Sequence, residues 1–315
     1  MMNMDNLKKF LEKINSREKF MGLLGFDEAM SLHCTFKAGG SADVWIKPAK
    51  EVFLSYVPEL LKAADNEGIP VFILGAGANI LVSDRGIRGI VLDTGDWAGM
   101  EKSEDALSVK VLSGTSVDSL AEELSNSSLS GLEFLAAMPG SVGGAVWMNA
   151  RCYGKSISDV LINTEILDES YNPEIIAFKP EDFSYKKSPF QSRKVLILSA
   201  GFKVYYREKE EIKKEMSSFR QDRIDKGHFR FPSAGSAFKN NHTFGDPSGK
   251  IIDQAGLRGF SIGGAQVAPW HGNIVINTGS ATARDIKDLM DEVARRVYEE
   301  RGFKLESEII FAGDW

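Results

Sequence analysis

The residues with the clearest chemical potential form a glycine-rich stretch between two apolar runs. Val71–Leu74 and Ile80–Val82 have the length and composition of buried strands. The residues that separate them are Gly75, Ala76, Gly77, Ala78 and Asn79. Glycine lets a backbone approach a ligand closely, and backbone amides in such a turn can face phosphate oxygens. The stretch therefore predicts a phosphate-binding loop between two strands.

A dinucleotide-binding fingerprint of the Rossmann type is the competing interpretation. Gly75 and Gly77 match its first half, and Asp93 lies near the usual acidic position. The third glycine position is Ile80, however, and residues 84–86 end the segment before a crossover helix could form. The Rossmann match is therefore weak, and a plain glycine-rich turn remains the other alternative.

A second glycine cluster follows a proline turn. Pro139 and Gly140 form the turn, and residues 143–145, Gly-Gly-Ala, carry almost no side chain. A flat ligand or another backbone could lie against them, and tight helix packing is the alternative explanation. Two separated glycine clusters without the lysine of a P-loop favour a large cofactor contacted from several loops.

The C-terminal third contains a serine and two acids that could move protons. Ser236 lies between small residues just after the turn at Pro232, which could hold its hydroxyl out on a rigid backbone. It lacks the glycine spacing of a hydrolase nucleophile elbow, and no adjacent histidine serves as its base. Residues 305–311 are predicted to form a strand, and its period of two puts Glu306 and Glu308 on one face. A turn serine and two solvent-facing acids are the plain alternatives.

The composition limits the class of protein. The chain has 315 residues, enough for two or three domains, and an ordinary hydrophobic fraction of 43%. A net charge of −6 argues against general nucleic-acid binding. Two cysteines and four histidines show no metal-ligand spacing, so we expect no metal site. We also expect a cytoplasmic protein, because no disulfide framework, signal peptide or membrane-spanning run is evident.

Mixed helices and strands must position these residues. Residues 1–30 are predicted to be helical and accessory, and residues 51–67 to form a helix after a strand at 42–46. Helices are also expected at 115–124, 208–224 and from Thr282 to Gly302. Strands are expected at 90–92, 107–112, within 159–176, and at 195–205 and 273–277.

Taken together, the motifs resemble the UDP-N-acetylenolpyruvoylglucosamine reductase (MurB) family. They occur in the family's order and cover nearly all of residues 33–311. The short distance between Tyr185 and Ser236 is similar to the short-loop (type II) branch. The matching segments are residues 35–43, 74–79, 87–89, 131–133, 138–145, 148–150, 234–240, 262–267 and 305–308.

The resemblance implies an α+β architecture with a vanillyl-alcohol-oxidase/PCMH-type FAD-binding fold. Two α/β subdomains would bind FAD, and a C-terminal α/β domain would bind substrate. The expected boundaries are accessory helices at 1–30, FAD subdomains at 31–90 and 91–205, and the substrate domain at 206–315. We expect a monomer that acts on a small-molecule UDP-sugar and binds neither nucleic acid nor membrane.

The implied reaction belongs to peptidoglycan precursor synthesis, and hence to cell-wall growth and division. Hydride would pass from NADPH through FAD to C3 of the enolpyruvyl group, and C2 would be protonated, giving UDP-N-acetylmuramate. By position, Ser236 would be the proton donor, with Glu308 and Lys186 also catalytic. Tyr185, Lys226 and Asn240 would contact substrate, and Arg151 is added as a hypothesised contact that the family pattern does not supply. The expected flavin contacts are Gly75, Ala76, Gly77, Ala78, Asn79, Ile80, Pro139, Gly140, Ser141, Gly143, Gly144 and Ala145.

The sequence departs from the family pattern in three places. Lys186 stands where the family has arginine, which keeps the charge and loses the bidentate fork. Residues 151–152, Arg-Cys, replace a usual small pair, and we hypothesise that Arg151 supplies the missing guanidinium, a surface arginine being the alternative. Asn241 occupies a position where proline is common.

Two other functions stay open from the sequence. A sugar or lactone oxidase of the same flavin fold often tethers FAD through histidine or cysteine. Residues 71–154 contain no histidine, and Cys152 is their only thiol. A nucleotide-sugar binding protein without catalysis is the second alternative. The presence of Ser236 and Glu308 argues against it, while Lys186 leaves it open.

Overall fold

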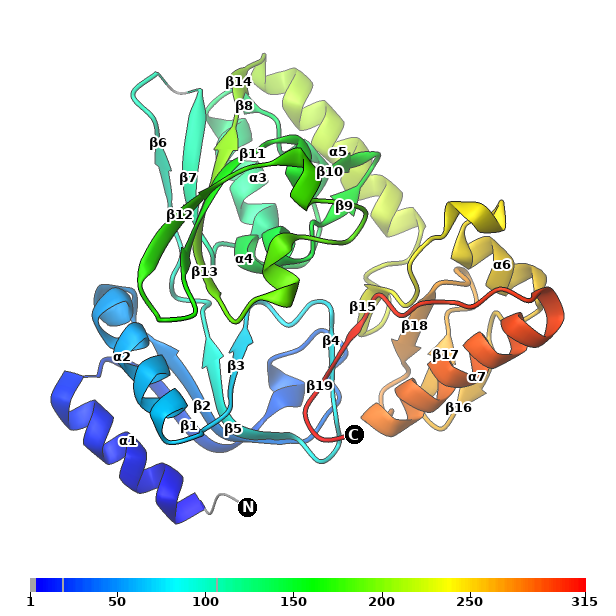
Figure 1. The fold of residues 1–315 in the computed structure, drawn as a ribbon. Coiled ribbons are helices and arrows are strands. Elements are labelled where there is room, and N and C mark those ends of the chain that lie inside the picture. The colour runs from blue at the N-terminus through cyan, green and yellow to red at the C-terminus, as the bar shows by residue number, and fades with distance from the viewer. Residues whose placement is uncertain (1–3, 19, 106) are drawn as a thin grey trace. The chain divides into compact units, whose positions relative to one another are not determined.

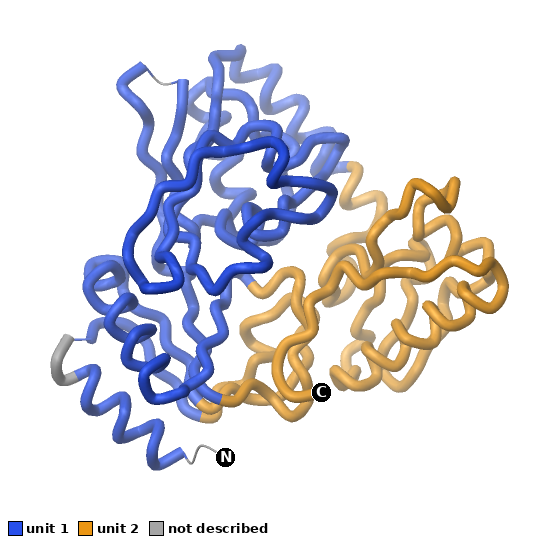
Figure 2. Tube along the Cα trace, viewed as in Figure 1, with its two compact units in different colours: residues 1–26, 44–76, 89–221 blue, residues 27–43, 77–88, 222–315 orange. Residues whose placement is uncertain are grey.

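The computed structural model describes residues 4–18, 20–105 and 107–315 (Figure 1). The chain divides into two compact units, and neither is one continuous stretch of sequence (Figure 2). Unit 1 comprises residues 1–26, 44–76 and 89–221, and unit 2 comprises residues 27–43, 77–88 and 222–315. The division into four consecutive domains stays a prediction. Residues 1–3 and 19 of the predicted N-terminal segment lie outside the described residues.

One part of unit 1 is built on a four-stranded sheet of order β1-β2-β5-β3, whose strands β1, β2 and β5 continue into unit 2. These strands are β1 (Gly22–Ala29), β2 (Ser41–Pro48), β5 (Ile87–Asp93) and β3 (Val71–Leu74). Helices α1 (Met4–Glu18) and α2 (Phe53–Asn66) share its core, where Phe53 and Tyr56 are completely buried. The helix predicted at 51–67 is thus confirmed. The helical prediction for residues 1–30 is wrong over β1.

The other part of unit 1 is an antiparallel five-stranded sheet of order β12-β11-β13-β7-β6. Phe134, Phe190 and Phe202 are fully buried in its core together with residues of α3 and α4. The hydroxyl of Ser116 caps α3 by accepting the Ser119 N–H. The strands and helices are β6 (Met100–Lys102), β7 (Ser108–Leu112), β11 (Leu161–Leu167), β12 (Pro173–Ala177), β13 (Leu196–Lys203), α3 (Val117–Asn126) and α4 (Val142–Trp147).

A long charged helix and two small strand pairs complete unit 1, and single-turn helices occur in both units. The charged helix α5 (Lys209–Asp225) uses Ile212 and Met216 to pack against Ala121 and Ala136. Two small antiparallel pairs are β8 (Leu129–Ser130) with β14 (Tyr205–Tyr206), and β9 (Arg151–Cys152) with β10 (Lys155–Ser156). Single-turn 3₁₀ helices in the two units are Met30–Leu32, Lys50–Val52, Glu133–Leu135, Ile157–Asp159, Pro180–Asp182, Pro189–Ser192 and His242–Phe244.

Unit 2 has an antiparallel sheet of order β15-β18-β17-β16 and a separate parallel pair, β4 with β19. Ile286, Leu289 and Val293 of α7 are buried in its core. The elements are β4 (Ile80–Val82), β15 (Ser233–Ser236), α6 (Ser248–Gln254), β16 (Ser261–Ile262), β17 (Ala265–Val267), β18 (Ile274–Asn277), α7 (Ala283–Arg301) and β19 (Ile310–Ala312).

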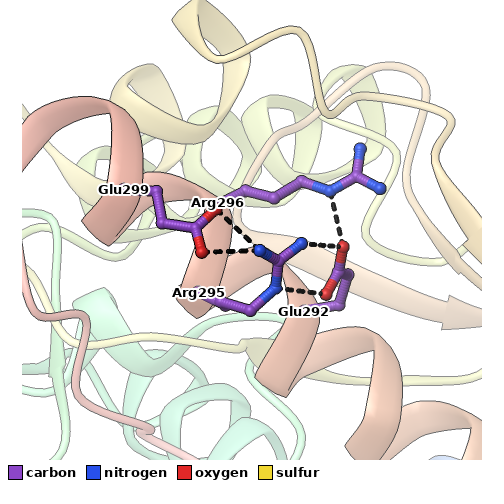
Figure 3. A network of polar contacts seen from close by, with 4 residues as sticks. All are labelled: Glu292, Arg295, Arg296 and Glu299. Atoms are coloured by element: carbon purple, nitrogen blue, oxygen red, sulfur yellow. Dashed lines mark hydrogen bonds and ion pairs between the residues drawn. The ribbon is translucent and has the colours of Figure 1, made fainter.

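Helix α7 begins and ends where the sequence predicts. Thr282 and Asp285 form a capping box at its start, and Gly302 ends it in the left-handed conformation. Figure 3 shows the ion-pair network on its exposed face, in which Glu292 accepts hydrogen bonds from Arg295 and Arg296. These guanidinium groups lower the pKa of Glu292 to about 2.

The continuous strand predicted over residues 305–311 is wrong. Only Ile310–Ala312 form a strand, and before it Ser307 makes an isolated bridge with Phe238. The segment leaves one pairing partner and joins another within three residues, so residues 305–309 build no ladder. The period-two argument that placed Glu306 and Glu308 on one face therefore does not apply.

Candidate functional site

The loop from Gly75 to Asn79 joins β3 to β4, as predicted. Among the described residues, no protein acceptor takes a hydrogen bond from any of its five backbone N–H groups. Gly77 adopts a positive φ of 60°, and a Cβ there would lie 2.0 Å from the carbonyl oxygen of His33. The loop thus needs glycine, and it offers a run of donors to a ligand rich in acceptor oxygens, such as the diphosphate of a dinucleotide.

The start of α4 lies against the first residue of that loop. A Cβ on Gly75 would come within 2.3 Å of the Ser141 hydroxyl, which caps α4 by accepting the Gly144 N–H. The Gly143 N–H donates to the Ser113 carbonyl, and a Cβ on Gly143 would lie 2.9 Å from the Ser113 Cβ. Close packing therefore explains Gly143. Gly144 is exposed, and its role as a flavin contact stays a prediction.

Ser236 ends β15 beside a bulge. β15 pairs with β18 through Ser233 opposite Ile276 and Ser236 opposite Ile274, so three steps on one strand match two on the other. Gly235 supplies the extra residue with a φ of 73°. A bulge redirects the side chains that follow it, and the Ser236 side chain is partly exposed. The expected rigid presentation of this serine thus has a backbone cause.

The segment carrying Glu308 is hydrogen-bonded to the residue after Ser236. The Glu308 N–H donates to the Ala237 carbonyl at 2.9 Å, and the Lys239 N–H donates to the Glu306 carbonyl at 2.8 Å. On its other side, the Glu308 carbonyl accepts a 3.0 Å hydrogen bond from Nδ2 of Asn79. Hydrogen bonds inside unit 2 therefore bring the Ser236, Glu308 and Asn79 segments together.

Glu306 and Asn240 have other partners close by. Glu306 is exposed and forms an ion pair with Lys239. The side-chain oxygen of Asn240 accepts the Ser248 N–H at 2.9 Å at the start of α6. Asn240 therefore helps fix α6, in addition to any role in substrate binding.

The turn that carries Tyr185 and Lys186 is fastened to the end of α4. Lys186 adopts the left-handed conformation with a φ of 58°, and its carbonyl accepts from Nε2 of Gln191 at 3.0 Å. Nδ2 of Asn149 donates to the Ser184 carbonyl at 2.9 Å. Both Tyr185 and Lys186 are half-buried. The amide side chains thus determine the backbone conformation of the turn.

Arg151 lies on β9, two residues after Asn149. It is exposed, and its Nη1 is 3.4 Å from the Ser156 hydroxyl. Asn149 is itself bonded to the Ser184 carbonyl of the turn that carries Lys186. The supply of a guanidinium by Arg151 stays a hypothesis.

Lys226 follows α5 within a cationic cluster. It is exposed and pairs with Asp222 at 2.8 Å, an exchangeable surface contact. Burial, then the charges of Arg223, His271 and Lys226, lower the pKa of His228 to about 4. The role of Lys226 in binding the substrate diphosphate stays a prediction.

Sequence reasoning missed the asparagine and glutamine side chains that hold these segments. Asn273, Asn149 and Gln191 each bind backbone carbonyls of segments that carry predicted site residues. Their only signal was a polar residue flanking an apolar element, which is also typical of an ordinary turn. Among the described helices, none is both long and apolar enough to cross a membrane.

Comparisons with known proteins match the chain in two regions. Residues 54–170 match the model of an FAD binding domain, and residues 227–312 match that of the UDP-N-acetylenolpyruvoylglucosamine reductase C-terminal domain. The fold is therefore a PCMH-type FAD-binding domain followed by this C-terminal domain, as the sequence predicts.

Similar whole chains carry the same description. UDP-N-acetylenolpyruvoylglucosamine reductase of Treponema denticola is 43% identical over 309 residues, covering 93% of this chain and 95% of the relative. That of Bacillus subtilis is 36% identical over 312 residues, covering 98% and 99%. The crystal structure of the Thermus caldophilus reductase superimposes with a TM-score of 0.76 at 31% identity, covering 93% of this chain and 99% of that one.

Proposed function

Because the chain belongs to the UDP-N-acetylenolpyruvoylglucosamine reductase family, we propose that it reduces UDP-N-acetylenolpyruvoylglucosamine to UDP-N-acetylmuramate with NADPH. The family assigns it as an FAD-dependent oxidoreductase (EC 1.3.1.98) of peptidoglycan precursor synthesis. We further propose that it belongs to the short-loop (type II) branch, acts in the cytoplasm as a monomer and takes a UDP-sugar as substrate.

The residues predicted to hold FAD fit this group. The five N–H groups of the Gly75–Asn79 loop, which donate to no acceptor among the described residues, suit its diphosphate. The residues from Pro139 to Ala145 adjoin that loop through Ser141. Bound FAD supplies the capacity to accept hydride from NADPH and deliver it to C3 of the enolpyruvyl group. The protein orients the substrate and supplies the proton.

Ser236 is proposed to give its hydroxyl proton to C2 of the substrate. The developing carbanion at C2 is strongly basic, so a weak acid suffices when it is well placed. Glu308 would be the acid that lies near the enol intermediate. The observation that carries this proposal is the 2.9 Å hydrogen bond from the Glu308 N–H to the Ala237 carbonyl, because it fixes the serine and glutamate segments side by side.

The substrate's anionic groups would be bound by polar and cationic side chains. We propose that Lys186, with Tyr185, faces the pyruvyl carboxylate, and that Arg151 assists. Lys226 and Asn240 would contact the diphosphate and nucleotide. Stabilising the charge that develops on the carboxylate lowers the barrier to hydride addition.

Separate measurement of the two half-reactions tests the proposal. In stopped-flow experiments, NADPH should bleach the flavin absorbance, and the enolpyruvyl substrate should restore it. Ser236→Ala should leave bleaching unchanged and slow the restoration by about 100-fold or more, the usual contribution of a general acid. Ser233→Ala, on the same strand, is the matched control and should affect neither step. Restoration at the normal rate in Ser236→Ala would contradict the assigned proton donor.

Covalent attachment of the flavin and its reoxidation by substrate distinguish the reductase from a flavin oxidase and from a binding protein. Denaturation should release the yellow colour from the chain, whereas a tethered cofactor of the oxidase type would stay attached. A protein that binds the UDP-sugar and never restores the absorbance would be a binding protein instead.

A further inference from the structure

We propose that Asn273 is a positioning residue that fixes the Ser236 hydroxyl by clamping the backbone of the two residues after it. This inference rests on the proposed role of Ser236 as proton donor. Asn273 immediately precedes β18, and its exposed fraction is 4%.

Three hydrogen bonds form the clamp. The Asn273 carbonyl accepts the Ala237 N–H at 2.8 Å. Its Oδ1 accepts the Phe238 N–H at 2.9 Å, and its Nδ2 donates to the Phe238 carbonyl at 2.8 Å. One side-chain amide thus satisfies both backbone groups of one residue, a geometry that restricts rotation as well as displacement.

The same short segment is held from the opposite side. The Ala237 carbonyl accepts the Glu308 N–H, so both backbone groups of Ala237 are engaged. Ala237 and Phe238 are almost completely buried, with exposed fractions of 1% and 4%. Ser236, by contrast, is partly exposed and follows Gly235, which has a φ of 73°. The clamp on the following residues therefore adds to the restraint that the bulge places on the backbone before Ser236.

Asn273 is itself oriented by its neighbours. Its own N–H donates to Nδ1 of His271 at 3.1 Å. A Cβ on Gly249 would lie 3.3 Å from the Asn273 Cβ, so α6 packs closely against it. Because the Asn273 side chain is held in place, its hydrogen bonds fix the position of the Phe238 backbone.

Asn273→Asp is the sharpest variant because it keeps the size and replaces the Nδ2 donor with a carboxylate oxygen. A carboxylate oxygen would then face the Phe238 carbonyl and push the segment away. We expect bleaching by NADPH to stay within about twofold of wild type. Restoration by substrate should slow by about 100-fold, the cost of misplacing a reacting group by about 1 Å. Protonation of the buried aspartate at lower pH restores a donor, so this defect should diminish from pH 8 to pH 6.

Asn277→Asp is the matched control. Asn277 is equally buried, ends the same strand, and donates to the carbonyls of Phe36 and Lys37 instead. It should lower stability without changing the ratio of the two half-reaction rates. Hydrogen–deuterium exchange should become faster at the Ala237 and Phe238 amides in Asn273→Asp and remain slow there in Asn277→Asp.

Different outcomes test the proton-donor role of Ser236 and the positioning role of Asn273. A normal restoration rate in Ser236→Ala would overturn the proton-donor assignment and this inference with it. If Ser236→Ala is impaired, equal slowing of both half-reactions in Asn273→Asp would overturn the positioning role alone. So would faster amide exchange with an unchanged restoration rate.

Discussion

Asn79 and Glu308 are joined by a 3.0 Å hydrogen bond from the Asn79 side-chain amide to the Glu308 backbone carbonyl. The Asn79 carbonyl in turn accepts the Ile310 N–H at 3.0 Å. Asn79 belongs to the predicted flavin loop and Glu308 is the predicted catalytic acid. The two hydrogen bonds therefore couple the conformation of the loop at Asn79 to the position of Glu308 within unit 2.

Asn79→Ala should weaken both the loop and the Glu308 segment. Loss of one partly buried hydrogen bond should lower the free energy of unfolding by about 1 kcal/mol, measured by urea denaturation. The restoration of flavin absorbance by substrate should slow by about tenfold as the Glu308 segment loosens. Asn163→Ala, a partly buried strand asparagine outside the predicted site, is the control. If Asn79→Ala altered FAD affinity alone, the link to Glu308 would have no catalytic role.

Gly75→Ala should weaken FAD binding through a steric conflict with Ser141. The added Cβ would lie 2.3 Å from the Ser141 hydroxyl, so the hydroxyl must leave its capping position or the loop must shift. We expect the Kd for FAD, measured by quenching of flavin fluorescence in apoprotein, to rise about tenfold, or about 1.4 kcal/mol.

The double variant Gly75→Ala/Ser141→Ala tests the cause of that loss. Removing the hydroxyl relieves the conflict, so the double variant should bind FAD more tightly than Gly75→Ala alone. Ser141→Ala by itself loses a helix cap and should cost about 1 kcal/mol of stability. Simple additivity of the two effects on Kd would show that the conflict with Ser141 is not the reason.

Local signals made much of the fold predictable. The apolar runs beside Gly75–Asn79 predict β3 and β4, and Thr282 and Gly302 mark the ends of α7 because caps act within one turn. The family resemblance added the order of the domains and the cofactor, which no single pattern could supply.

Long-range pairing explains what the sequence could not predict. β1 forms at the edge of a sheet, and its residues 22–29 do not alternate between apolar and polar. Glu308 is held by bonds to Ala237 and Asn79, which are far away in sequence, so no local period reveals it. Asn273 gives no periodic signal, because its role depends on the backbone it faces.

The hypothesis that Arg151 compensates for Lys186 predicts a selective loss. Arg151→Ala should lower kcat/KM for the enolpyruvyl substrate by about tenfold, since one charge-assisted contact contributes roughly 1.5 kcal/mol. Lys186→Arg in the same chain should recover part of that loss by restoring a bidentate group. Steady-state kinetics of the single and double variants measure both effects. If Arg151→Ala leaves turnover intact while Lys186→Ala abolishes it, the hypothesis is wrong.

His228 should make the stability of the protein fall between neutral and acidic pH. Burial and the neighbouring cations lower its pKa to about 4, below the value of about 6.5 expected in the unfolded chain. Between these values the unfolded state binds the proton and the folded state does not, so acid favours unfolding. The stabilisation is complete above about pH 6.5 and is lost as the pH falls towards 4. The pKa of His271 is also lowered, mainly by burial, so His271 adds to the same trend.

His228→Asn should therefore flatten the pH dependence without abolishing it. The difference in Tm between pH 7.5 and pH 5, measured by differential scanning fluorimetry, should be smaller than in wild type, because one of the two contributing histidines is removed. His242→Gln changes an exposed histidine and is the control, expected to keep the wild-type difference. An unchanged Tm difference in His228→Asn would mean that other groups dominate the acid response.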